Sequence, residues 1–406
     1  MKNLLKGGVK VLAGAGIALG LALGGPAAAQ EKDIVWSIHL GLTGASAFAA
    51  RFQLAGFTDY VEWKNGNGGI RGRKIKLLSE DTTFKVDVAV AGFKKVMAEN
   101  AEVVFVSGDS TGFVQGTSPE NNDRFKRLMT SGSFASEFDD VKKFPYNFLA
   151  GPSYADMMGV LLEYIKKDWK GSGAPKLAII HSSIEFGRDP IEWAQKRAKE
   201  LGIDVNLVIQ NKIVEVDPSP DALKLRQANP DYTIFHGYAY STWPEILKLA
   251  KDYGMKTKFL GTVWASDAPA LARLGPGIDG YVAVAPYAYR TAGATEPTLK
   301  IIDGILRKKD PAYDGYPTHG YMQSWTNATL AATAAEMVID AKKPLNGDTM
   351  KEALESLRNW DTGGIFGAPV DMKNHKMAIG RVYRFDAKAG QPLQVTPVSD
   401  WIKLAN

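Results

Sequence analysis

Short apolar runs alternate with segments of helical periodicity along the chain after residue 33. The apolar runs, which are typical of buried strands, are Ile34–Leu40, Ile75–Leu78, Val103–Val106, Leu177–His181, Val205–Ile209, Tyr232–His236 and Phe259–Leu260. The segments with helical spacing between them are Phe52–Asn65, Val86–Asn100, Ala155–Lys167, Ile191–Leu201, Pro220–Gln227 and Pro244–Tyr253. Strict alternation of strands and helices predicts an α/β fold with parallel sheets that helices cover on both faces.

Two of these strands end in small or polar residues. Val103–Val106 runs into Ser107–Gly112, and Leu177–His181 is followed closely by Glu185–Gly187. In parallel α/β sheets the carboxyl ends of the strands open onto a ligand crevice. The pattern therefore predicts two α/β lobes that face each other across a cleft. This arrangement favours a protein that binds a ligand over one that catalyses a reaction.

The first 29 residues have the pattern of a cleaved export signal. Lys2, Lys6 and Lys10 form a basic start, Val11–Gly25 is apolar and uncharged, and Ala27–Ala29 supplies small residues for cleavage. The alternative is an uncleaved membrane anchor, but the apolar run is shorter than the ~20 residues that span a bilayer. We therefore expect a signal peptide over residues 1–29, cleavage near Ala29, export across the inner membrane and no membrane insertion after cleavage; a periplasmic location is what the family resemblance described below implies.

Composition narrows the possible partners and chemistry. Hydrophobic residues make up 45% of the chain and charged residues 23%, which is typical of a globular protein. Of the formal net charge of +5, three lysines lie in the signal, and the remaining +2 argues against a nucleic-acid partner. The absence of cysteine excludes disulfides, a thiol nucleophile and cysteine-bound metal. The five histidines show no HxH or HExxH spacing, so we expect neither a metal site nor a cofactor.

Seven short motifs follow one another in the order found in a known protein family. They are Ile38–Gly44, the turn Asn65–Gly72 reading NGNGGIRG, Asp81, Gly108–Gly112, Phe186–Gly187, Asn229–Asp231 and Ala250–Gly254. In these motifs the chain resembles the periplasmic solute-binding proteins of ABC importers, of the leucine/isoleucine/valine-binding type. The resemblance extends over nearly the whole chain after the signal.

The resemblance implies a type I periplasmic-binding-protein fold. This is a Venus flytrap of two Rossmann-like lobes with parallel sheets, joined by a three-stranded hinge that closes around the ligand. The expected N-terminal lobe covers residues 30–148 and 282–364, and the C-terminal lobe covers 149–281 and 365–406. The implied partners are a small-molecule ligand and the membrane permease subunits of an importer, and the protein is expected to be a monomer.

Candidate ligand-binding residues of the first lobe follow predicted strands. Ser110 and Thr111 stand where a helix should begin, and their hydroxyls and the unpaired backbone N–H groups of a first helical turn suit a carboxylate. A plain helix cap is the alternative role. The loop Thr130–Ala135 matches the next ligand loop of the family, in which Ser133 and Ala135 would offer a hydroxyl and a backbone N–H to the same carboxylate.

Aromatic candidates come from both lobes. Phe186 occupies the place of a ring that lies over the ligand in the family, and Tyr238 matches a second aromatic contact. Phe48 and Arg51 follow the first loop, and Arg51 is able to bind a carboxylate through two hydrogen bonds. A buried core position is the alternative for the rings, and a solvated surface position is the alternative for the arginine.

The loop Gly261–Trp264 departs from the family pattern. Amino-acid binders of this type have an acidic residue here that pairs with the ligand ammonium, whereas this chain has Val263 beside Trp264. An ammonium group without a partner would be costly to enclose. The departure favours an aromatic or aliphatic acid whose apolar body contacts Trp264. A shift in alignment that makes Asp267 or Glu185 the partner would restore an amino-acid ligand, and an amide is a further alternative.

A rival hypothesis from another class rests on Gly108–Gly112, which also fits the G-x-S-x-G pattern of α/β-hydrolases. Ser110 would then be the nucleophile, and His319 or His375 would complete a triad. The upstream segment His39–Gly41 is not the glycine-rich loop that supplies an oxyanion hole in those enzymes. We therefore expect a binding protein rather than an enzyme.

Overall fold

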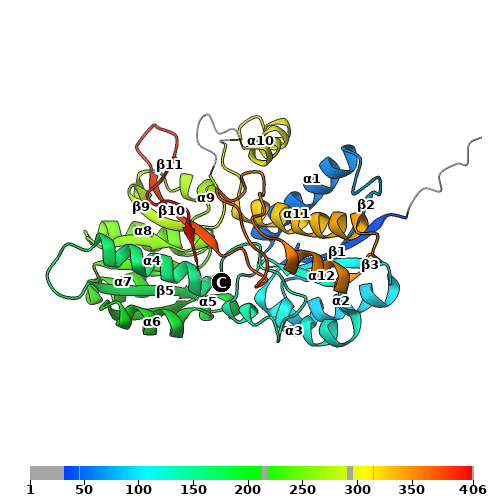
Figure 1. The fold of residues 1–406 in the computed structure, drawn as a ribbon. Coiled ribbons are helices and arrows are strands. Elements are labelled where there is room, and N and C mark those ends of the chain that lie inside the picture. Colours follow the sequence, from blue (N-terminus) through cyan, green and yellow to red (C-terminus); the bar gives the residue numbers. More distant parts are fainter. Residues whose placement is uncertain (1–31, 45, 213–216, 290–295, 314, 405–406) are drawn as a thin grey trace, which may run out of the picture.

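The computed structural model describes residues 32–44, 46–212, 217–289, 296–313 and 315–404, and the predicted signal peptide lies outside them. The described residues form two α/β lobes that lie side by side, each built around its own sheet (Figure 1). This confirms the predicted two-lobed α/β architecture. Within the described ranges, no helix is long and apolar enough to cross a membrane.

The first lobe contains a four-stranded, entirely parallel sheet. Its strands, in spatial order, are β2 (Ile75–Asp81), β1 (Ile34–Leu40), β3 (Val103–Gly108) and β4 (Leu128–Ser131). The connecting helices are α1 (Ala47–Gly66), α2 (Val86–Glu99) and α3 (Thr111–Glu120), the last of which continues into η1 (Asn121–Phe125). The chain reverses its direction of travel across the sheet between β1 and β3. This is the switch point at which open α/β sheets bind ligands, just beyond the carboxyl ends of the strands.

The second lobe contains an eight-stranded sheet. Its parallel strands, in spatial order, are β9 (Tyr281–Ala285), β8 (Lys258–Gly261), β7 (Tyr232–His236), β5 (Lys176–Ser182) and β6 (Asp204–Asn211). The associated helices are α4 (Tyr154–Asp168), α5 (Glu185–Arg188), α6 (Ile191–Glu200), α7 (Ser219–Ala228), α8 (Trp243–Asp252) and α9 (Ala268–Ala272), with the short 3₁₀ helices η3 (Val263–Ala265) and η4 (Gly275–Ile278). Another 3₁₀ helix, η2 (Ser136–Asp139), follows β4 before the chain enters the second lobe. Here the switch point lies between β5 and β7.

The edge of the second sheet next to β9 is antiparallel, in contrast to the prediction of parallel sheets throughout. It consists of β10 (Ile379–Asp386), β11 (Gln394–Pro397) and β12 (Ile402–Lys403). The expected lobe boundary at residue 282 falls inside β9, which pairs with β8 and β10. In terms of sheet membership, the chain therefore leaves the second lobe only after Ala285.

Three helices from the C-terminal half of the chain complete the first lobe: α10 (Pro297–Lys309), α11 (His319–Asp340) and α12 (Gly347–Ser356). The long α11 packs along α1, and α12 packs against α11 and β4 (Figure 1). Most of the residues in α11 are buried, including the polar side chains of Gln323 and Asn327. Because nearly every side of the helix faces protein, its sequence lacks the amphipathic spacing that marks helices such as α8.

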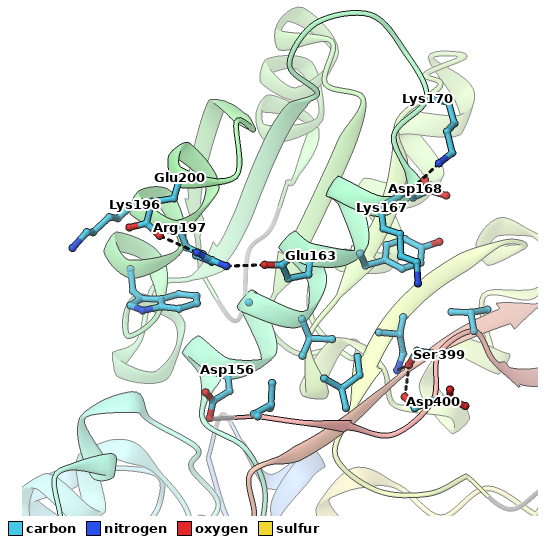
Figure 2. A pocket seen from close by; sticks show the side chains of 18 residues that line it. Asp156, Glu163, Lys167, Asp168, Lys170, Lys196, Arg197, Glu200, Ser399 and Asp400 are labelled. Carbon is cyan, nitrogen blue, oxygen red and sulfur yellow. Dashed lines mark hydrogen bonds and ion pairs between the residues drawn. The ribbon is translucent and has the colours of Figure 1, made fainter. Parts of the chain in front are cut away.

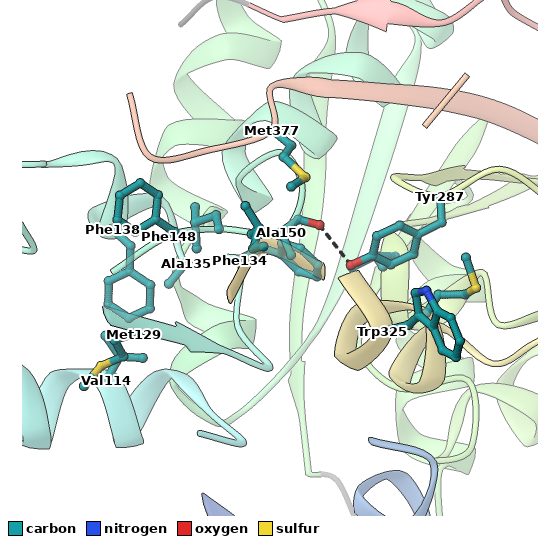
Figure 3. Close-up of a cluster of buried hydrophobic side chains, with 14 of the residues drawn as sticks. Val114, Met129, Phe134, Ala135, Phe138, Phe148, Ala150, Tyr287, Trp325 and Met377 are labelled. Carbon is teal, nitrogen blue, oxygen red and sulfur yellow. Dashed lines mark hydrogen bonds between the residues drawn. The ribbon is translucent and has the colours of Figure 1, made fainter. Parts of the chain in front are cut away.

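Three segments of the chain cross between the lobes; the first contains Leu149, the second Tyr287 and the third His375. They pack together and are linked by hydrogen bonds. Leu149 of the first crossover pairs with the third, where its N–H donates to the His375 carbonyl at 2.7 Å. The hydroxyl of Tyr287, just after β9, donates to the carbonyl of Ala150 at 3.0 Å. Figure 3 shows this bond within a cluster of buried apolar side chains that includes Phe134 and Met377. The hinge is therefore a well-packed unit rather than a set of loose linkers.

Candidate functional site

The cleft lies between the loops that follow the strands of both lobes. Two small adjoining cavities share four lining residues, Phe84, Asp109, Gly132 and Tyr238. Their volumes are about 30 and 10 Å³. Ligand pockets usually measure about 300–1,000 Å³, so the side chains of the two walls fill the cleft in this closed conformation.

The wall from the first lobe gathers the predicted hydroxyl groups. Ser110, Thr111 and Ser133 line one cavity, although they come from two different loops. The hydroxyls of Thr111 and Ser133 lie 2.6 Å apart, and Ser110 Oγ accepts the Phe113 N–H at the start of α3. Parallel neighbours β3 and β4 end side by side, which places the two loops next to each other. Ser110 thus serves as a helix cap and lines the cleft at once.

Gly132 allows this close approach of the two loops. A Cβ added at this position would lie 2.6 Å from the backbone oxygen of Asp109 and 2.5 Å from the side-chain nitrogen of Gln53. Its N–H donates to the Gly108 carbonyl at 2.7 Å. Any larger residue would therefore push the β4 loop away from the loop that carries Ser110.

Two of the predicted first-lobe contacts do not line either cavity. Ala135 is fully buried, and its N–H donates to Ser133 Oγ at 3.0 Å, so it supports that serine instead of facing the cleft. Arg51 is exposed, and its guanidinium lies over the ring of Phe52 at 4.6 Å. Arg51 thus occupies a solvated surface position in this structure, which is the alternative to ligand binding given above.

Aromatic side chains form the wall from the second lobe and meet the first lobe across the cleft. The ring of Tyr238 lies 5.0 Å from that of Phe186 and 5.9 Å from that of Trp264. Phe48, from α1 of the first lobe, packs edge-on against Tyr238 at 5.6 Å. Phe186, Tyr238, Trp264 and Phe48, the four aromatic residues expected to contact the ligand, all line the cavities. Edge-to-face contacts of this kind stabilise ring pairs beyond simple burial.

Trp264 is held in place by a hydrogen bond. Its indole N–H donates to the hydroxyl of Tyr154 at 2.8 Å, and both residues are buried. Tyr154 is the first residue of α4, and burial raises the pKa of its hydroxyl well above the usual value of a tyrosine. The hydroxyl therefore stays neutral, and it accepts the hydrogen bond that the indole N–H donates.

Several residues of the cleft were not predicted from the sequence. They include Ser46, Phe52, Gln53, Phe84, Asp109, Tyr154, Tyr240 and Thr318. Tyr240 follows Tyr238 at a spacing of two, and its ring lies 5.8 Å from Phe48, so the pair of tyrosines was a signal for a two-ring contact. Asp109 stands between Gly108 and Ser110, in a segment whose pattern points to the hydroxyls of Ser110 and Thr111.

Of the loop Gly261–Trp264, which lacks the expected acid, only Trp264 lines a cavity. Val263 is fully buried and lines neither cavity, whereas the neighbouring Trp264 does. Asp267 lines the larger cavity, but both its oxygens accept hydrogen bonds from the protein. Oδ1 accepts the Tyr240 hydroxyl at 2.9 Å, and Oδ2 accepts the His319 N–H at 2.8 Å. Because His319 begins α11 of the first lobe, this carboxylate links the two lobes.

The rival hydrolase triad is not assembled. His319 Nε2 bonds Ser266 Oγ at 2.7 Å and the Tyr289 hydroxyl at 2.9 Å, and His375 Nε2 bonds Glu355 at 2.8 Å. Burial lowers the pKa of His319 to about 3. Across the described part of the chain, no histidine forms a hydrogen bond with Ser110, and no cluster of side chains suits a metal ion.

A larger cavity lies elsewhere on the second lobe, with a volume of about 980 Å³. Its lining comes from α4, α6 and the C-terminal strands, with Glu163, Arg197 and Glu200 forming ion pairs along one side (Figure 2). All of its lining residues belong to one lobe. Closure of the two lobes therefore cannot enclose a ligand there.

Comparisons with known proteins agree with this geometry. The family model described as "Periplasmic binding protein" matches residues 39–392. The chain is 25% identical to the Leu/Ile/Val-binding protein of Citrobacter freundii, over 70% of this chain and 75% of that protein. The fold is similar to that of a branched-chain amino acid ABC transporter protein from Thermus thermophilus with bound valine, with a TM-score of 0.81, 22% identity, and coverage of 93% of this chain and 97% of that one. It is also similar to a solute-binding protein from Rhodopseudomonas palustris in complex with 3,4-dihydroxybenzoic acid, with a TM-score of 0.76, 15% identity, and coverage of 92% and 98%. The resemblance and the fold predicted from the sequence are thereby confirmed.

Proposed function

The chain belongs to the periplasmic binding protein family, and we propose that it captures a small carboxylate-bearing ligand with a hydrophobic or aromatic body for an ABC importer. The ligand would bind in the cleft between the lobes, and the closed complex would deliver it to the permease subunits in the membrane. One observation carries the proposal: three hydroxyls at the start of α3 and after β4 face an aromatic wall within one interlobe cleft.

The hydroxyl side of the cleft suits the carboxylate end. Ser110, Thr111 and Ser133 converge at the N-terminus of α3, where backbone N–H groups and the helix dipole favour a negative group. Hydrogen bonds to a charged group contribute about 1.5–3 kcal/mol each. The first lobe therefore fixes the orientation of the ligand.

The aromatic side suits an apolar body. Phe186, Tyr238 and Trp264 of the second lobe and Phe48 of the first already contact one another when the cleft is closed. A ligand body inserted among them would replace ring–ring contacts with ring–ligand contacts. Each favourable aromatic contact adds about 0.5–1.5 kcal/mol beyond burial.

A hydrophobic amino acid is the second candidate ligand. The relative from Citrobacter freundii is a Leu/Ile/Val-binding protein, whereas the structural neighbour from Rhodopseudomonas palustris binds an aromatic acid. Both ligand classes share the carboxylate and the apolar body. They differ in the ammonium group, which the acid-free loop at Val263 does not accommodate.

Calorimetry with matched ligands tests the carboxylate. 3-Phenylpropionate should bind at least tenfold more tightly than 3-phenylpropanamide, or leucine more tightly than leucinamide, because the amides lack the negative charge. Ser110→Ala should weaken the carboxylate ligand by tenfold or more, from the loss of one charge-assisted bond. Ser356→Ala, which removes an exposed hydroxyl on α12, is the control. Equal binding of acids and amides would refute the proposal, and labelling of Ser110 by a fluorophosphonate would favour the hydrolase.

A further inference from the structure

The described residues that line the cleft include carboxylates but no basic side chain. Among the described residues that line its two cavities, Asp109, Glu185 and Asp267 are acidic, and none is lysine, arginine or histidine. Arg51 lies outside the cavities, over the ring of Phe52. A ligand whose only charge is a carboxylate would therefore add a negative charge to a cleft that already carries negative charge.

Two of the three acids are occupied by the protein itself. Glu185 pairs with Arg188 at 3.5 Å on the short helix α5. Asp267 accepts hydrogen bonds from Tyr240, from the Ala270 N–H and from the His319 N–H, and these hold the start of α9 and the contact between the lobes. Both carboxylates therefore have partners within the protein and do not need a ligand group to bind.

Asp109 differs from both. It is only 7% exposed and is one of the four residues shared by the two cavities. Its Oδ2 accepts the Thr82 hydroxyl at 2.5 Å, and it forms no ion pair with any lysine or arginine of the described ranges. Burial raises the pKa of its carboxyl, although the hydroxyls of Thr82 and Ser110 act in the opposite direction. A buried carboxylate without a cation is costly unless a partner neutralises it.

The rings around Asp109 favour a cation as that partner. Phe84 and Tyr238 line both cavities together with Asp109, and Phe48 and Trp264 contact Tyr238. The faces of aromatic rings attract ammonium groups electrostatically. The same cavities thus combine several aromatic rings with one buried carboxylate that is hydrogen-bonded but has no ion-pair partner among the described residues.

We propose that Asp109 is a specificity-determining residue that pairs with an ammonium group of the ligand. The inference rests on the proposed function, because the ligand carboxylate would occupy the adjoining hydroxyls of Ser110, Thr111 and Ser133. The preferred ligand is then a zwitterion, and the counter-charge for its ammonium comes from the first lobe instead of from the loop at Val263.

Three probes with the same body separate the two charged groups of the ligand. Phenylalanine carries both, 3-phenylpropionate carries only the carboxylate, and 2-phenylethylamine carries only the ammonium. Leucine, 4-methylpentanoate and 3-methylbutylamine form the same series with an aliphatic body. Calorimetry at pH 7 with the wild-type protein should show the amino acid of one series binding at least tenfold more tightly than its deaminated acid.

Two variants assign the preference to Asp109. Asp109→Asn retains an acceptor for the Thr82 hydroxyl, and it should remove the preference by weakening the amino acid at least tenfold while leaving the deaminated acid unchanged or tighter. Glu185→Gln removes a different cleft acid and should keep the preference. Thermal unfolding of each variant verifies that it is folded.

The outcomes separate this inference from the proposed function. If the acids bind as tightly as the amino acids, or if Asp109→Asn keeps the wild-type preference, the role of Asp109 is refuted and the carboxylate site stands. If the amines bind as tightly as the amino acids, the ammonium site stands and the carboxylate site is refuted. Binding of none of the six probes would overturn both.

Discussion

The hydrogen bond between Trp264 and Tyr154 should be measurable as a coupling energy in unfolding experiments. Trp264→Phe removes the donor of this 2.8 Å bond and Tyr154→Phe removes the acceptor, while each variant keeps an aromatic ring. The indole has a single N–H, so Tyr154→Phe leaves a buried donor unpaired, at a cost of about 1–3 kcal/mol. Trp264→Phe loses ring area as well, and its cost should be larger.

The double variant isolates the bond itself. Its loss of stability should be smaller than the sum of the single losses by about 0.5–1.5 kcal/mol, the net contribution of a neutral hydrogen bond. Urea unfolding followed by far-UV circular dichroism measures all four proteins. Trp264→Phe combined with Tyr146→Phe, whose hydroxyl bonds Asp348 in the first lobe, should be additive within about 0.3–0.5 kcal/mol. Equal coupling energies for the two pairs would refute the idea that Tyr154 holds the indole.

Three further predictions concern the cleft. Asp109→Asn should be more stable than the wild type at pH 7, and thermal melts between pH 7 and 4 should show this difference shrinking on acidification. The pKa of Asp109 is raised in the folded state, so the folded wild type takes up a proton at a higher pH than the unfolded chain does. The stability of the wild type therefore rises as the pH falls through that raised pKa. Gly132→Ala should lower stability by about 1–3 kcal/mol and abolish binding, because its Cβ would meet Asp109 and Gln53, whereas Gly277→Ala, with open space around it, should do neither. Small-angle scattering should give a smaller radius of gyration at saturating ligand, and an unchanged profile would contradict closure by hinge rotation.

The elements that the sequence predicted best are those with one clear period. Apolar runs such as Val103–Val106 lie within β3, because a strand buried on both faces carries apolar residues at successive positions. Amphipathic helices such as α6 were located within a residue of their ends. The long α11 was not predicted, because it is buried on most sides and its sequence gives no contrast between faces. The antiparallel edge formed by β10 to β12 was missed because the argument from alternating strands and helices applies only to parallel crossovers.

Within the candidate site, residues at strand ends were easier to place from the sequence than residues on helices. Residues at strand ends, such as Ser110 and Ser133, were placed by topology, because neighbouring parallel strands bring their following loops together. Side chains that reach the cleft from a helix were harder to place, and only one of Phe48 and Arg51 lines it. The position of a residue on a helix determines the face of the helix on which it lies. A long side chain can still lie along the surface, as that of Arg51 does over Phe52. Asp109 was overlooked because its neighbours offered a simpler role for the loop.

The position of Asp109 changes the argument that began with Val263. The absence of an acid from that loop favours a ligand without an ammonium group only if the counter-charge must come from the second lobe. The electrostatic cost of enclosing an ammonium group depends on the charges close to it, and closure brings loops of both lobes around the ligand, so either lobe can supply the counter-charge. With Asp109 beside Ser110 and Thr111, both polar ends of a zwitterion would bind to the first lobe. The aromatic wall of the second lobe, anchored by the bond between Trp264 and Tyr154, would then close over the apolar body.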